Sequence, residues 1–155
     1  MKKIILFLFL ILGTISFSAL ELDTNKIQKK NLQITVQDEV VVTLEKSEKD
    51  YEESIFYILG KENETAKDIS QATVKTALKS QKVISTYETE KAYVVKFKEI
   101  ESGIISYSIV DKQITTKGWY VGIIFVPKKE LSENELNKTF SNFSNLLDEA
   151  RNFIK

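Results

Sequence analysis

The most informative stretch of the sequence is GWYVGIIFVP, residues 118–127. It is apolar at both odd and even positions, which is typical of a strand that is covered on both faces and lies in the middle of its sheet. Pro127 has no N–H to donate to a neighbouring strand, so we expect the strand to end there.

The residues that follow predict one long amphipathic helix. A capping box marks its start, because the Ser132 hydroxyl can accept from the Glu135 N–H while the Glu135 carboxylate reaches back to the cap. Leu131 and Leu136 flank this cap as a hydrophobic staple. Apolar residues then recur at spacings of three and four, as they do on one helical face: Leu136, Phe140, Phe143, Leu147, Ala150 and Ile154.

The composition limits the chemistry that is available to the chain. A length of 155 residues is typical of one domain, and a net charge of zero argues against nucleic acid, which requires a basic face. Because the chain has no cysteine and no histidine, disulfides, thiolate nucleophiles, classical zinc sites and histidine bases are excluded. A metal ion would need oxygen ligands, as calcium and magnesium do. We expect neither a cofactor nor a metal site.

The N-terminal segment Met1–Ser18 has the form of a secretory signal peptide. Lys2 and Lys3 precede an apolar run, Ile4–Leu12, and small residues at positions 16 and 18 favour cleavage after Ser18. The alternative is a retained membrane anchor, but a spanning helix needs about 20 apolar residues and this run is shorter. The sequence therefore predicts a periplasmic or secreted protein with no membrane span after cleavage.

The rest of the chain predicts a loose lead-in at residues 19–31 and one α+β domain at 32–155. The domain is expected to be a mostly antiparallel sheet packed with two main helices, since the polar connections are short. The charged residues 45–53 are interpreted as a solvated loop, because they lack the ligand alternation and central glycine of a calcium loop. Hydrophobic periodicity predicts strands at 32–36, 40–44, 54–59, 83–87, 93–98, 105–109 and 114–126, and helices from Ala66 to near Ser80 and from Ser132 onward.

This order of elements resembles the PsbP/DcrB-like superfamily of small exported α/β proteins. The resemblance covers residues 32–154 and rests on element order: a hairpin, an apolar strand (Ser54–Gly60), a helix (Asp68–Ser80), a meander, and a long strand leading into a C-terminal helix (Trp119–Lys155). It implies an antiparallel sheet between helices and a non-enzymatic accessory role in the cell envelope. DcrB-like members are anchored through a lipidated cysteine, which this chain lacks.

An enzymatic role is the alternative from a different functional class. The 22 acidic residues provide many carboxylate pairs, which could serve a hydrolase but single out no site. A serine–lysine pair is the second option, because Lys96, Lys98 and Ser106 lie on neighbouring predicted strands. Most of the acidic residues lie in polar loops beside lysines, so we expect a binding protein rather than an enzyme.

The predicted binding surface is the junction where Lys117, Gly118, Trp119 and Tyr120 lead into the long apolar strand. Loops held by a rigid sheet commonly carry binding sites, and this junction combines a cation with two large aromatic residues. The partner is expected to be an envelope protein or a small ligand. A further alternative is an adhesion or assembly subunit that pairs through an exposed sheet edge.

Overall fold

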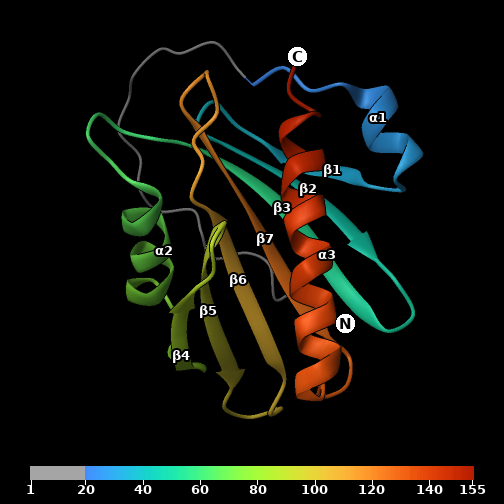
Figure 1. Cartoon of the computed structure of the whole chain (residues 1–155), viewed down its shortest axis with the longest axis vertical. Helices are drawn as coiled ribbons and strands as arrows, with labels where there is room; N and C mark the ends of the chain where they lie inside the picture. The colour runs from blue at the N-terminus through green and yellow to red at the C-terminus, as the bar shows by residue number, and fades with distance from the viewer. Residues whose placement is uncertain (1–19) are drawn as a thin grey trace.

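The computed structural model describes residues 20–155, which form a single antiparallel sheet packed with helices (Figure 1). The predicted α+β class is therefore confirmed, whereas the predicted signal peptide and its predicted cleavage site lie outside the described residues. The elements in chain order are α1 (Thr24–Lys29), β1 (Gln33–Gln37), β2 (Val41–Ser47), β3 (Tyr51–Leu59), α2 (Ala66–Lys75), β4 (Gln81–Glu88), β5 (Ala92–Glu99), β6 (Ile105–Asp111), β7 (Trp119–Pro127) and α3 (Glu133–Arg151).

The sheet has the strand order β1-β2-β3-β7-β6-β5-β4, and every pairing is antiparallel. β7 is the central strand and is buried along almost its whole length, as its two-sided apolar pattern predicted. It pairs with β3 from Tyr51↔Pro127 to Leu59↔Trp119, which joins the β1–β3 meander to the β4–β7 meander. This central pairing leaves β1 and β4 as the two edge strands of the described sheet.

One face of the sheet is covered by α3 and α1 (Figure 1). Phe143, Leu147 and Ala150 of α3 are buried against the centre of the sheet, as the helical periodicity predicted. The hydroxyl of Tyr57 on β3 donates to the Ala150 carbonyl oxygen at 2.9 Å. Burial raises the pKa of Tyr57, so this phenol remains a protonated donor that ties α3 to the sheet.

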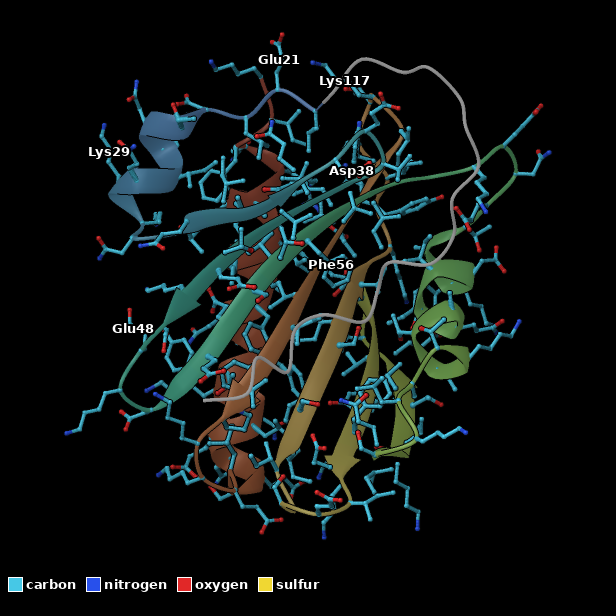
Figure 2. The ribbon with its side chains drawn as sticks, turned by 180° about the vertical axis from the view of Figure 1, so that it is seen from behind. Glu21, Lys29, Asp38, Glu48, Phe56 and Lys117 are labelled. Atoms are coloured by element: carbon cyan, nitrogen blue, oxygen red, sulfur yellow. The ribbon has the colours of Figure 1, made fainter. Side chains whose placement is uncertain are left out.

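The opposite face is packed against α2, which runs beside β5 and β6 (Figure 2). Ala66 and Ile69 of α2 lie against Phe56, Val110 and Tyr120 in a second, smaller core. The Phe56 ring fills the space above a glycine of β7, where an added Cβ would overlap the ring. The glycine at position 122 therefore leaves room for the tip of the Phe56 ring against the central strand.

The expectation of a loose lead-in at residues 19–31 is wrong for the residues that the structure describes. Leu20, Leu22 and Ile27 are buried in the α3-side core, and the Asp23 carboxylate caps α1 by accepting from two backbone N–H groups. Leu22 also forms a β-bridge with Ile154 at the other end of the chain. The cause is long-range packing, because three widely spaced apolar residues in a polar segment produce no periodic signal of their own.

Several predicted boundaries also needed correction. Residues 45–53 are mostly strand rather than loop, since β2 and β3 continue their pairing to Ser47↔Glu52. In the other direction, α2 ends at Lys75 and not near Ser80, and β7 begins at Trp119 instead of Ile114. Backbone pairing explains the first difference, because a strand next to a well-formed partner can continue through polar residues whose side chains reach water.

The capping box of α3 leads to a pH-dependent prediction. The Glu135 carboxylate accepts from the Ser132 N–H at 2.9 Å and from its hydroxyl at 2.8 Å, and Lys129 lies 3.1 Å away. The hydrogen bond from the Ser132 backbone makes the largest contribution, and together these interactions lower the pKa of Glu135 to about 2. The ionised Glu135 carboxylate therefore stabilises the folded protein fully above the ordinary pKa of 4.5, and this stabilisation is lost as the pH falls towards 2.

We therefore expect Glu135→Gln to lower the melting temperature at pH 7, and the difference from the unmodified protein to shrink steadily below pH 4.5. The measurement is thermal unfolding across this pH range. Glu133→Gln is the matched control, because Glu133 lies in the same first turn but is not part of the capping box. A difference between the Glu135→Gln variant and the unmodified protein that does not change with pH would contradict the assignment.

Candidate functional site

The four residues of the predicted binding surface are divided between the surface and the two cores. Lys117 is exposed and its ammonium donates to the backbone carbonyl of Lys155, while Gly118 adopts a left-handed conformation with φ of 79°. Trp119 is only 3% exposed and lies in the α3-side core, and Tyr120 is 4% exposed on the α2 side. Successive strand residues point to opposite faces, so each ring enters a different core. This junction therefore offers a partner no exposed aromatic side chain.

The serine and lysine residues of the predicted β5–β6 pair lie on opposite faces of the sheet. Ser106 is paired with Phe97, and both side chains point towards the α2 side. Lys96 and Lys98 alternate with Phe97 and therefore point towards the α3 side. The sheet separates each hydroxyl from both ammonium groups, so this register does not assemble a serine–lysine site.

Carboxylates were the other candidate ligands or catalytic groups. Between residues 20 and 155, no group of three or more acidic side chains is arranged to hold a metal ion. Asp111 is buried, but it is bonded to Arg151 and lies between a strand end and α3. Within the same residues, no helix is both long and apolar enough to cross a membrane.

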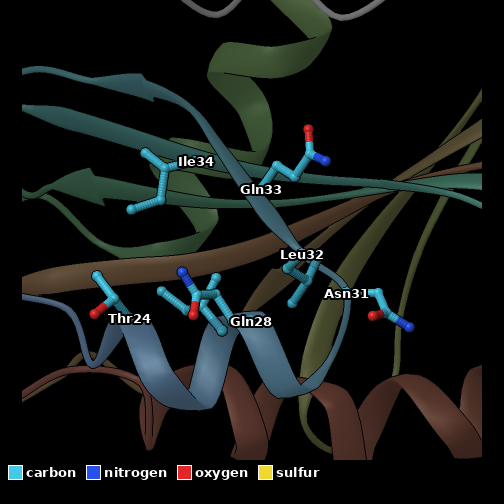
Figure 3. Close-up of a pocket in the computed structure, with 7 residues that line it drawn as sticks. Thr24, Gln28, Asn31, Leu32, Gln33 and Ile34 are labelled. Carbon is cyan, nitrogen blue, oxygen red and sulfur yellow. The ribbon is translucent and has the colours of Figure 1, made fainter.

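A cavity of about 500 Å³ lies between α1 and the edge strand β1 (Figure 3). Its size falls within the range of small-ligand sites, but its lining contains no charged or aromatic side chain that would orient a ligand. No sequence signal indicated it, because it exists only where α1 packs beside β1. The residues lining it are Thr24, Ile27, Gln28, Asn31, Leu32, Gln33 and Ile34.

The other edge strand, β4, exposes large apolar side chains. Ile84 is 44% exposed and Tyr87 is 39% exposed, although both belong to a strand of the main sheet. Within the described sheet the strand is hydrogen-bonded only to β5, so the backbone groups on its outer side have no strand partner there. A β-bulge between Val83 and Ser85 interrupts the register. Tyr87 is held by an edge-to-face contact with Phe140 of α3, whose ring centroid is 5.8 Å away.

Three lysines lie beside these apolar residues on the α3 side of the sheet. Lys82 is directly opposite Lys98 in the β4–β5 pairing, and Lys96 precedes Lys98 by two positions on β5. Among residues 20–155 none of the three forms an ion pair with a carboxylate. The Lys96 ammonium lies 5.9 Å from the centre of the Tyr107 ring. We call Lys82, Ile84, Tyr87, Lys96 and Lys98 the β4 edge surface.

The electrostatics of this surface are those of cations beside neutral phenols. Burial, followed by the proximity of Tyr107, raises the pKa of Tyr87 to about 12, so its hydroxyl stays protonated at neutral pH. Burial and the charge of Glu130 raise the pKa of Tyr107 in the same direction. The β4 edge surface therefore combines apolar contact area, a free strand edge and positive charge.

Part of this site was visible in the sequence. In residues 93–98, Tyr93, Val95 and Phe97 alternate with Val94, Lys96 and Lys98, which predicted a strand with one wetter face. That β4 is an edge strand, and that Lys82 lies opposite Lys98, depends on strand order and register. These features cannot be read from periodicity within one strand.

The fold and the β4 edge surface do not by themselves assign the chain to a family. The resemblance to the PsbP/DcrB-like superfamily rests on the order and hydrophobic pattern of the elements, and it stays a prediction. No family model matches the sequence, and comparisons with curated proteins and with solved structures found no match.

Proposed function

We propose that this chain is an exported envelope protein that acts by binding a partner protein along the edge of its sheet. The observation that carries the proposal is the β4 edge surface, where Ile84 and Tyr87 remain exposed on a strand that has no outer partner in the described sheet. The proposal is for a binding or assembly role and not for catalysis.

The physical basis is the unsatisfied hydrogen-bonding capacity of an edge strand. An extended segment of another chain can add to such an edge, gaining backbone hydrogen bonds, while exposed side chains provide apolar contact and selectivity. The residues Val83–Tyr87 are β-branched, aromatic or hydroxyl-bearing, which favours the extended conformation that pairing requires.

Two further features support an envelope location. The segment Met1–Ser18 has the pattern of a secretory signal, and the element order resembles a superfamily of exported accessory proteins. A chain without cysteine would keep its fold in either a reducing or an oxidising compartment, because no disulfide contributes to it.

One cross-linking experiment tests both parts of the proposal. Because the chain has no cysteine, Ile84→Cys introduces a unique thiol at the centre of the β4 edge surface. Intact cells that produce this variant are treated with a thiol-reactive photo-cross-linker that cannot pass the cytoplasmic membrane. We expect labelling of the thiol and, after illumination, one discrete adduct whose mass identifies a partner protein.

The matched control is Ile34→Cys, because Ile34 is 37% exposed but lies on β1, at the opposite edge of the sheet from β4. It should be labelled by the same reagent without giving the adduct. No labelling at either position would contradict export. Labelling at both positions with the same adducts, or with none, would contradict binding at the sheet edge.

A further inference from the structure

We infer that the partner segment that adds to β4 is acidic, with carboxylates on the face that lies beside Lys82, Lys96 and Lys98. This inference rests on the proposed function, because it specifies the chemistry of the segment that the β4 edge surface binds. The segment is an extended stretch of protein in which acidic residues occupy successive positions of one face, followed by an apolar residue.

The first argument is the uncompensated charge on this part of the sheet. Lys82 and Lys98 are directly opposite each other on neighbouring strands, an arrangement of like charges that destabilises a sheet. Neither lysine forms an ion pair with a carboxylate among residues 20–155. The β4 edge surface is therefore a place where carboxylates from a partner would relieve repulsion that this chain leaves in place.

The second argument concerns the protective use of lysine at sheet edges. A single lysine or a bulge on an edge strand commonly prevents unwanted pairing, and β4 has both, in Lys82 and in the irregularity after Val83. Protection does not account for Lys96 and Lys98, because they lie on β5, one strand in from the edge. Together the three lysines form a charged area two strands wide, which also disfavours pairing of β4 with a second copy of itself.

The third argument is geometric. A strand added beside β4 would lie about 4.8 Å from it, with alternate side chains on the α3 side. On that side, the residues of the added strand would lie first beside Lys82 and next beside Ser85, whose neighbour on β5 is Lys96. The last of them would lie beside Tyr87. Carboxylates at the first two places would reach Lys82, Lys98 and Lys96, and an apolar side chain at the third would contact the exposed part of the Tyr87 ring.

The probe for this inference is a short, fluorescently labelled peptide with glutamate at two successive positions of one face, leucine at the third, and threonine on the other face. Its binding to a truncated chain of residues 19–155, without the predicted signal peptide, is followed by fluorescence anisotropy. We expect saturable binding that weakens with added salt. Binding should also slow hydrogen exchange of backbone amides in β4, because strand addition gives them acceptors.

The decisive variant is Lys82→Glu/Lys98→Glu, which should lower the affinity for the glutamate peptide about tenfold or more. The same variant should bind a matched peptide that has lysine in place of glutamate. Lys61→Glu/Lys67→Glu is the control for net charge, because both lysines are exposed near the start of α2, on the opposite face. It should leave the affinity within about twofold, since exposed charges at a distance are screened.

Other outcomes overturn the inference. A scrambled peptide of the same composition, or a sulfated polysaccharide, that binds as tightly would show general anion binding without strand addition. No binding of the glutamate peptide, or equal weakening by both double variants, would exclude an acidic segment at this edge. If Ile84→Cys still gives its adduct when Lys82 and Lys98 are replaced by glutamate, the proposed function stands and the acidic partner does not.

Discussion

Phe143→Ala is expected to lower the free energy of unfolding by about 3–5 kcal/mol, as large-to-small changes in a core commonly do. Phe143 is 4% exposed, and its ring makes edge-to-face contacts with Phe125 and Phe140 at centroid distances of 4.9 and 5.8 Å. Alanine would remove both contacts and leave a cavity between α3 and the central strand. The measurement is urea unfolding of the chain that begins at Ala19.

The control for this prediction is Asn142→Ala, one residue earlier on the same helix and exposed to solvent. It removes a surface amide without affecting the core, so its effect should stay within about 0.5 kcal/mol. A cost below about 1 kcal/mol for Phe143→Ala would show that α3 is not held on the sheet through this ring.

Arg151→Met is expected to cost about 3–5 kcal/mol, because it leaves a buried carboxylate without its counter-charge. Asp111 ends β6 and is 3% exposed, and the Arg151 guanidinium of α3 contacts it and Asp148. Once the guanidinium is removed, the Asp111 carboxylate keeps the backbone N–H of Gln113 as a donor, at 3.0 Å, but that neutral group does not balance its charge. Urea unfolding at pH 7 measures the loss.

The double variant Arg151→Met/Asp111→Asn provides the control, since it removes both charges and should recover most of the lost stability. Recovery would show that the cost of the single variant comes from an unpaired buried charge and not from lost packing of the arginine side chain. If the double variant is as unstable as Arg151→Met, this ion pair is not what connects the end of β6 to α3.

Local signals in the sequence were enough to predict much of the fold. The two-sided apolar run of β7 identified the central strand, and the Ser132–Glu135 capping box identified the start of α3. The α+β class followed from these elements and from the short polar connections. Such signals succeed because burial on both faces and helix capping are set by residues close together in the chain.

The candidate site was much less predictable. Trp119 and Tyr120 were expected at a binding surface, but alternation along a buried strand places one ring in each core. Conversely, the sequence pattern placed Tyr87 only in the strand predicted at 83–87, and the structure leaves it exposed in the β4 edge surface. An aromatic residue can pack or bind, and which of these it does depends on what covers it.

The sequence by itself determined the approximate positions of strands β1 to β7 and of helices α2 and α3, which strand is fully covered, and which chemistries are excluded by the lack of cysteine and histidine. Tertiary structure decided that residues 20–30 join the core, that β1 and β4 are the edges, and that Lys82 lies opposite Lys98. The reason is physical. Periodicity and capping are interactions between near neighbours in the chain, whereas sheet order, register and burial arise from contacts between residues far apart in it.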